Sequence, residues 1–128
     1  MLIARYMPQK IIAAGDPYQS EVEQTAGAIM AQLDGVDWSV CYQSRVGPLK
    51  WIGPSTESEI QRAAADKKAI VLYPLSFVSE HSETLVELDI DYRRLAAQAG
   101  VPAYVRVPTV GTHPKFIEGL ARLVRDAL

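Results

Sequence analysis

The sequence predicts a three-layer αβα fold, in which a four-stranded parallel sheet lies between two layers of helices. Short apolar runs alternate with stretches of helical periodicity along the chain, which is the rhythm of βαβ units. The run at residues 69–75 is almost continuously apolar, as expected for a strand covered on both faces. Right-handed crossovers, with helices on both faces and one reversal of direction, predict the strand order 2-1-3-4.

Each element is predicted from a local pattern. Asp16 and Pro17 supply a cap and a first-turn proline for the first helix, and Ser55 caps the second. Gly35 and Gly100 follow helix ends, where glycine tolerates the left-handed conformation that closes a helix. The predicted strands are residues 2–6, 38–43, 69–75 and 103–107, and the predicted helices are residues 18–33, 56–65, 81–99 and 114–127.

The composition is that of one folded domain, residues 1–128. Apolar residues make up 48% of the chain and charged residues 22%, with both signs interspersed, so disorder is not expected. The formal net charge of −2 gives no electrostatic reason to expect a nucleic-acid partner.

Cys41 is the single cysteine, so one chain can build no internal disulfide, thiolate zinc site or four-cysteine iron–sulfur cluster. A cytoplasmic setting fits this composition best. The apolar runs are too short to span a bilayer, and no signal peptide is recognisable, so only peripheral membrane contact stays open.

Ligands of a parallel sheet bind beyond the carboxyl ends of its strands. After the third predicted strand come residues 79–83, Ser-Glu-His-Ser-Glu, with Glu87 one turn later. This combination of an imidazole and carboxylates suits divalent-metal binding or proton relay. The alternative is a solvated helix start, because acidic residues are favoured there without any function.

A second cluster, residues 42–54, follows the second predicted strand. It holds two Gly-Pro pairs, the cations Arg45 and Lys50, and Trp51. An exposed Trp with two cations suits a flat apolar ligand that bears carboxylates, although a purely structural turn explains the Gly-Pro pairs equally well. No role is expected for Cys41 or for His113, which begins the last helix.

Three motifs in this order resemble ferrochelatase, the enzyme family that inserts ferrous iron into protoporphyrin. They are Gly-Asp-Pro-Tyr at 15–18, Tyr-Gln-Ser-Arg-Val-Gly-Pro at 42–48, and Phe-Val-Ser-Glu-His-Ser-Glu-Thr-Leu-Val-Glu-Leu-Asp at 77–89. The resemblance covers nearly the whole chain. It implies a chelatase-like half-domain, similar to the C-terminal half of a bacterial-type enzyme of haem synthesis. Ferrous iron and protoporphyrin are then substrates, and no cofactor is permanently bound.

The resemblance also implies roles for individual residues. His81, Glu83 and Glu87 match positions that handle protons or metal, with His81 and Glu83 as the metal ligands. The porphyrin-binding positions are Tyr42, Arg45 and Trp51.

The segment at residues 3–8 departs from the family's pattern. A Ser-Ala-His-Gly-Leu-Pro-like motif normally opens this half, whereas this chain has Ile-Ala-Arg-Tyr-Met-Pro at 3–8, which places Arg5 in the histidine slot. Arginine stays protonated, so it can neither accept a pyrrole proton nor ligate iron.

Two hypotheses follow from the resemblance. The first is a ferrochelatase domain that inserts iron as a homodimer, with activity reduced or lost because of Arg5. The second is a non-catalytic ferrochelatase fragment, an engineered scaffold, or a module that binds porphyrin or metal.

Overall fold

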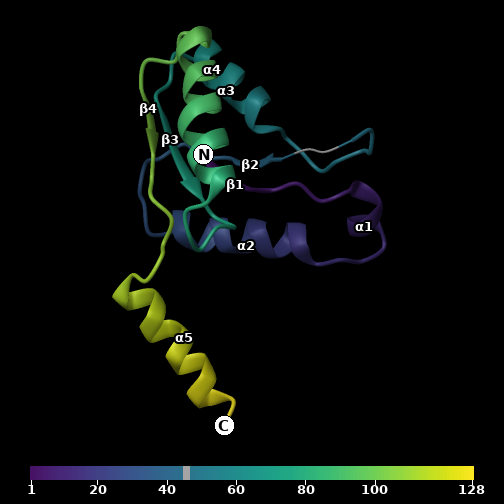
Figure 1. Ribbon diagram of the computed structural model, residues 1–128, viewed down its shortest axis with the longest axis vertical. Helices are drawn as coiled ribbons and strands as arrows, with labels where there is room; N and C mark the ends of the chain where they lie inside the picture. Colours follow the sequence, from purple (N-terminus) through teal and green to yellow (C-terminus); the bar gives the residue numbers. More distant parts are fainter. Residues whose placement is uncertain (45–46) are drawn as a thin grey trace.

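The computed structural model describes residues 1–44 and 47–128 and confirms the predicted parallel sheet (Figure 1). Within these residues the sheet has four strands, in the order β2-β1-β3-β4. Each strand is shorter than the apolar run that predicted it, because the outer residues of each run lie beyond the strand's last paired position. The strands are β1 (Leu2–Arg5), β2 (Val40–Gln43), β3 (Ile70–Pro74) and β4 (Tyr104–Arg106).

The helices agree with the predictions to within one residue except in three places. A short helix inside the first loop was not predicted, since a single turn shows no helical period. The predicted helix at 18–33 ends at Met30. The predicted helix at 81–99 begins only at Glu83 and opens with two turns of the wider π form. The helices are α1 (Gln9–Ala13), α2 (Tyr18–Met30), α3 (Thr56–Ala65), the π-helix η1 (Glu83–Asp91), α4 (Tyr92–Ala99) and α5 (Pro114–Asp126).

The predicted helix caps are present except at Gly35, which lies beyond the end of α2 at Met30 and closes no helix. Ser55 Oγ accepts a hydrogen bond from the Ser58 amide at 3.1 Å, and Asp16 Oδ1 accepts one from the Tyr18 amide at 2.9 Å. Gly100 closes α4 with φ of 84°, the left-handed conformation that favours glycine.

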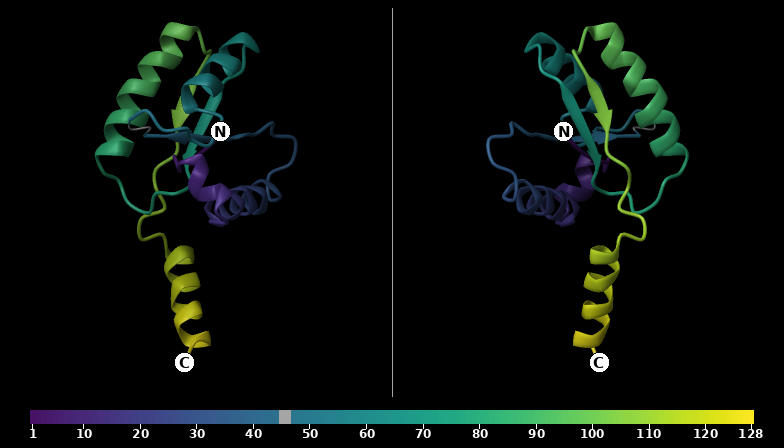
Figure 2. Two further views of the ribbon diagram at one scale, coloured as in Figure 1. Left: turned by 90° about the vertical axis from the view of Figure 1, so that its right-hand side faces the viewer. Right: turned by 90° about the vertical axis from the view of Figure 1, so that its left-hand side faces the viewer.

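Helices cover the two faces of the sheet unequally. Figure 2 shows α4 on one side of the sheet and α2 on the other. Because side chains alternate along a strand, Ile3 of β1 joins the core cluster with α3 and α4, whereas the next residue, Ala4, joins the cluster with Val22 of α2. The chain therefore builds two thin cores, one on each face.

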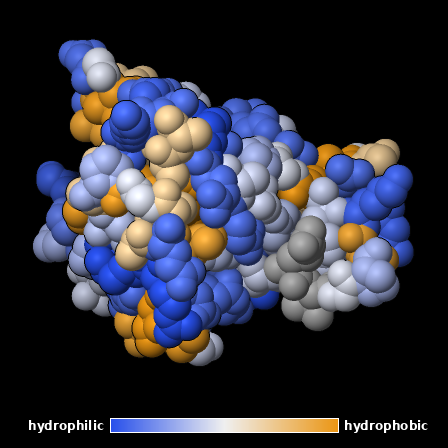
Figure 3. Space-filling view, turned by 90° about the horizontal axis from the view of Figure 1, so that it is seen from above, coloured by the Kyte–Doolittle hydropathy of each residue, from blue (hydrophilic) through white to orange (hydrophobic). Residues whose placement is uncertain are grey.

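The α2 side of the sheet is only partly covered. Val71 of β3 is 57% exposed and Val105 of β4 is 54% exposed, so the prediction that the third strand is covered on both faces is wrong. An apolar groove of about 300 Å³ lies between α2 and this strand, with Met30, Val71 and Tyr73 among its lining residues. Seen from above, apolar patches also interrupt the polar surface (Figure 3).

Helix α5 leaves the body of the molecule. It projects from the sheet with the C-terminus at its far end (Figure 2), and it contains no buried residue. Two of its apolar side chains, Leu123 and Val124, are more than half exposed. No helix among the described residues is both long and apolar enough to cross a membrane.

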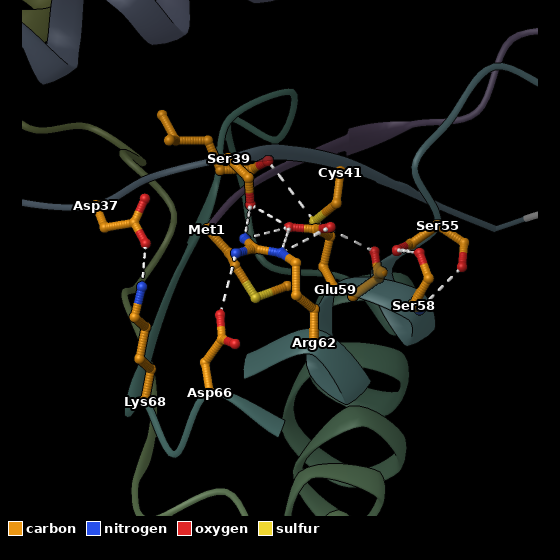
Figure 4. A network of polar contacts seen from close by, with 12 residues as sticks. Met1, Asp37, Ser39, Cys41, Ser55, Ser58, Glu59, Arg62, Asp66 and Lys68 are labelled. Atoms are coloured by element: carbon orange, nitrogen blue, oxygen red, sulfur yellow. Dashed lines mark hydrogen bonds and ion pairs between the residues drawn. The ribbon is translucent and has the colours of Figure 1, made fainter. Parts of the chain in front are cut away.

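A polar network joins β2 to α3 near the amino ends of the strands (Figure 4). Glu59 is 8% exposed and accepts hydrogen bonds from Ser39 at 2.6 Å and from Arg62 at 2.7 Å. Burial opposes the ionisation of Glu59, but the hydrogen bonds from Arg62 and Ser39 hold its pKa below the ordinary value. Lys68 pairs with Asp37 beside this network. These charges satisfy one another, which is what a structural network requires.

Candidate functional site

The candidate site lies at the carboxyl ends of β1 and β2, the edge at which parallel sheets bind ligands. Strand β1 ends at Arg5 and β2 ends at Gln43, which is followed by Ser44. Helix η1 crosses above them and contributes Glu83 and Glu87, whose side chains both reach Ser44.

Ser44 joins the two carboxylates. Its Oγ lies 3.0 Å from Glu83 Oε2, and 3.1 and 3.0 Å from the two carboxylate oxygens of Glu87. The φ angle of Ser44 is 65°, in the left-handed region that non-glycine residues seldom adopt. Backbone strain of this kind is concentrated at functional sites and is held in place by its surroundings.

Gln43, at the end of β2, donates hydrogen bonds to Glu87 and to Ser44. It is fully buried, and its Nε2 donates to Glu87 Oε2 at 3.0 Å and to Ser44 Oγ at 3.1 Å. Its Oε1 has no hydrogen-bond partner among the described residues. A buried amide inside a strand is expensive unless it is hydrogen-bonded, so its place beneath Glu87 indicates a site rather than ordinary core packing.

The two carboxylates share fewer donors than they can use. The Ser44 hydroxyl carries one proton and can donate it to only one carboxylate at a time. Burial raises the pKa of Glu87, and the charge of Glu83 adds to that rise against the hydrogen bond from Ser44. The pair is therefore suited to taking up a proton or a cation.

Arg5 lies at the open side of this pair. Its Nη2 is 3.4 Å from Glu83 Oε1, and its side chain is 57% exposed. The guanidinium partly neutralises Glu83 and carries a positive charge beside the pair. Arg5 therefore contacts the candidate site directly.

His81 precedes η1 and takes part in its first turn. Its Nδ1 accepts a hydrogen bond from the Glu83 amide at 3.2 Å, and its ring packs against Phe77 with centroids 5.1 Å apart. Because Nδ1 accepts, the proton of the neutral imidazole lies on Nε2. To bind a metal through Nε2, the imidazole would have to lose the proton on Nε2. If that proton moved to Nδ1, Nδ1 could no longer accept the hydrogen bond from the Glu83 amide.

The described residues contain no group of three or more His, Cys, Asp or Glu side chains arranged to hold a metal ion. Two carboxylates meet at Ser44, and His81 stands at the start of the same helix without a hydrogen bond to either carboxylate. The prediction of His81 and Glu83 as metal ligands remains a prediction.

Aromatic residues form the second part of the site. The Tyr6 ring lies 6.2 Å from the Tyr42 ring and 5.9 Å from the Trp51 ring, between centroids. Tyr42 is 1% exposed and belongs to the core, so it supports this cluster from within. Tyr6 and Trp51 line a shallow depression of about 420 Å³, together with Leu49 and Lys50. Arg45, the third residue predicted to bind porphyrin, lies outside the described residues.

Sequence reasoning assigned no role to Gln43 and Ser44. The available signal was a glutamine that ends an otherwise apolar strand, within the motif at 42–48. The absence of a predicted role for Cys41 agrees with its burial, which raises the pKa of its thiol to about 12. His113 caps α5, since its Nδ1 accepts from the Lys115 amide at 3.3 Å.

Comparison with known proteins gives a consistent result. The sequence model of the ferrochelatase family matches residues 4–128. Ferrochelatase of Caulobacter vibrioides is 56% identical over 126 residues, which cover 98% of this chain and 36% of the relative. Ferrochelatases of Phenylobacterium zucineum and Wolbachia pipientis wMel are 50% and 53% identical, over 98% and 94% of this chain and 37% and 38% of the relatives. The chain thus spans little more than a third of these relatives' length.

Proposed function

Because the chain belongs to the ferrochelatase family of haem biosynthesis, we propose that it contributes the proton- and iron-handling side of a site that inserts ferrous iron into protoporphyrin. The observation that carries this proposal is the convergence of Glu83 and Glu87 on Ser44, with the buried Gln43 beneath them. Insertion replaces the two pyrrole protons of protoporphyrin by one Fe²⁺, so the reaction needs groups that accept protons and groups that attract a cation.

Glu83 and Glu87 can do both in turn. In the proposed reaction the porphyrin is distorted so that its nitrogen lone pairs point toward the metal, and a carboxylate accepts each departing proton. Glu87, whose pKa is raised by partial burial, is the better proton acceptor of this half-buried pair. Ferrous iron approaches along the same two carboxylates, with His81 as a further ligand.

Porphyrin would lie against the aromatic side of the site. Tyr6 and Trp51 line the depression there, and Lys50 provides a cation for a propionate group. We place this reaction in the cytoplasm, with membrane contact, if present, limited to the surface of the molecule.

A homodimer provides one route to a two-sided cleft. The groove beside Val71 and the apolar side of α5 are surfaces that a second copy can cover.

The test is iron-dependent haem formation from protoporphyrin by the purified chain. We expect low activity in the wild type, higher activity in Arg5→His, and none in Arg5→His with Glu83→Gln and Glu87→Gln. Glu23→Gln on α2, whose carboxylate accepts from Gln19 at 3.0 Å, is the matched control and should leave activity unchanged. Equal activity in all these variants would rule out the assigned roles.

The second candidate function is a module that binds porphyrin or metal without catalysis. The ion pair between Arg5 and Glu83 favours it, because the pair neutralises one carboxylate of the site. Quenching of protoporphyrin fluorescence without haem formation, in both the wild type and Arg5→His, would support this candidate over the enzyme.

A further inference from the structure

Arg106 on β4 contacts the segment that carries the two site carboxylates at two separate positions. Its side chain is 10% exposed. Its Nε and Nη2 donate to the two carboxylate oxygens of Asp89 at 2.8 and 2.6 Å, and its Nη1 donates to Glu80 Oε1 at 2.6 Å. One guanidinium therefore ties the residue three positions before η1 to a residue near the end of η1.

Other contacts from the same edge of the sheet reinforce this clamp. The Thr109 amide donates to Glu80 Oε1 at 2.9 Å, and the Tyr104 hydroxyl donates to the Leu88 carbonyl at 2.8 Å. Glu80 and Arg106 carry opposite charges, so their contact at 2.6 Å is an ion pair.

The sheet order explains why this contact affects the site. Strands β2 and β4 form opposite edges of the sheet, and η1 is attached to both. Asp89 is held at the β4 edge, while Glu83 and Glu87 reach Ser44 at the end of β2. The direction of the two carboxylates therefore depends on how the β4 edge holds the helix.

The π form of η1 makes this dependence strong. Helices with the i→i+5 hydrogen-bond pattern are rare and usually short, and they are frequent at functional sites. An unusual backbone form persists only where the surrounding contacts determine it. Helix α4 continues directly from η1 as an ordinary α-helix, so the chain can adopt the tighter form nearby.

We propose that Arg106 is a positioning residue, which holds Glu80 and Asp89 so that η1 keeps its π form and directs Glu83 and Glu87 at Ser44. This inference rests on the proposed function only in treating the two carboxylates as the site. The clamp itself is a property of the fold and can be measured without metal or porphyrin.

The chain offers a matched control in Arg93. Its Nε donates to the Asp89 carbonyl at 3.1 Å, and its Nη2 lies 3.9 Å from Asp89 Oδ1. It is 52% exposed and no bond joins it to Glu80 within the described part of the chain. It also donates to the Tyr104 carbonyl at 3.2 Å. Substitution of Arg93 therefore removes contacts to Asp89 and Tyr104 but leaves the bonds from Arg106 to Glu80 and Asp89 in place.

The test compares amide hydrogen exchange in wild type, Arg106→Gln, Arg106→Lys and Arg93→Gln, residue by residue. In Arg106→Gln we expect amides of η1 to exchange at least about tenfold faster relative to those of α3, since each lost charge-assisted bond accounts for a factor of that order. The exchange rate of η1 in Arg106→Lys should lie between those of the wild type and Arg106→Gln, because lysine keeps the charge but cannot bridge both carboxylates in the same geometry. Arg93→Gln should match the wild type in η1.

A general loss of stability has a different signature, since it would accelerate exchange in α3 and η1 by the same factor and would overturn the proposal. Where Arg106→Gln does not fold, Glu80→Gln opens one arm of the clamp and should give a smaller acceleration confined to η1. Unchanged exchange in that variant would also contradict the clamp.

Cobalt titration then links the clamp to the site. Arg106→Gln should bind Co²⁺ at least about fivefold more weakly than Arg93→Gln, since a displaced carboxylate loses one ligand contact. A wild type that binds no Co²⁺ would contradict the proposed metal path but leave the exchange result standing. Equal Co²⁺ affinity in the two variants would show that the clamp does not position the site.

Discussion

Arg5 has more influence on the site than its position at the end of β1 suggests. Its guanidinium lies 3.4 Å from a Glu83 oxygen and carries a positive charge at every ordinary pH. Replacement by histidine removes that charge at neutral pH and adds a group that can accept a proton. The substitution Arg5→His is therefore the change that can distinguish an enzyme from a non-catalytic binding module.

We expect Arg5→His to bind Co²⁺ about tenfold more tightly than the wild type, which is roughly the effect of removing one unit charge a few ångströms away in partly solvated surroundings. Isothermal titration at neutral pH measures this change. Arg122→His on α5 controls for the loss of positive charge elsewhere and should not alter the affinity. Identical affinities for Arg5→His and Arg122→His would contradict the expectation.

Ser44 combines two properties that substitution can separate. Alanine and glycine both remove the hydroxyl that joins Glu83 and Glu87, but only glycine relieves the φ angle of 65°. We expect Ser44→Ala to be less stable than Ser44→Gly by about 1 kcal/mol, the usual cost of a left-handed non-glycine residue. Urea unfolding of both variants tests this, and a more stable Ser44→Ala would refute it.

Because of Glu80, the free energy of unfolding should depend on pH in the acidic range. Its pKa in the folded state is about 2, below the ordinary value of 4.5, so the unfolded chain binds a proton at Glu80 more readily. The contribution of Glu80 to stability is complete above pH 4.5 and is lost as the pH falls toward 2. The stability difference between wild type and Glu80→Gln should shrink over that interval. A difference that stays constant from neutral to acidic pH would be inconsistent with the Arg106 contact.

At the scale of elements, the caps behave as local sequence rules require. Ser55→Ala removes the acceptor for the Ser58 amide, and we expect it to lower the free energy of unfolding by about 1 kcal/mol. Ser55→Asp keeps an acceptor at the same place and serves as the control. Both are measured by urea unfolding, and an alanine variant as stable as the aspartate variant would show that the cap contributes nothing.

Local sequence rules predict the presence of helix η1 but not its π form. The apolar pattern predicts a helix that runs on to Ala99, and the structure has one. The apolar pattern cannot predict the π form of η1, because helix propensity and periodicity describe an isolated helix and not its contacts with the strands. The wide form is held by contacts from two strands, through Arg106 on β4 and the Gln43 to Ser44 corner after β2.

At the scale of the whole molecule, the open side of the sheet is the main unexplained surface, and it leads to the prediction of a homodimer. We expect sedimentation at about tens of micromolar, where modest interfaces hold, to show a dimer. Val71→Lys places a charge on the open face and should shift the population to monomer. Val78→Lys, at a loop position of similar exposure, 55% against 57%, is the control. A wild-type monomer at these concentrations would contradict the prediction and favour the fragment hypothesis.

Part of the candidate site could be predicted from the sequence. Glu83, Glu87, His81 and Trp51 are chemically distinctive residues in loops that follow strands, so topology placed them at one edge. The roles of Gln43 and Ser44 were not predictable, because they depend on Glu87 and Glu83 arriving from 40 or so residues away. Tyr42 stays a predicted porphyrin contact, and its exposure of 1% was not predictable, because a residue type alone does not reveal how deeply its side chain is buried.

The sequence by itself determined the alternation of strands and helices, the strand order 2-1-3-4 and the family, because these follow from short-range patterns, chain connectivity and ordered motifs. Only the tertiary structure decided that β3 is open on one face, that η1 is a π-helix, and that Arg5 pairs with Glu83. The physical reason is the same for all three. Each depends on which groups distant in sequence lie within a few ångströms, and no local pattern encodes that distance.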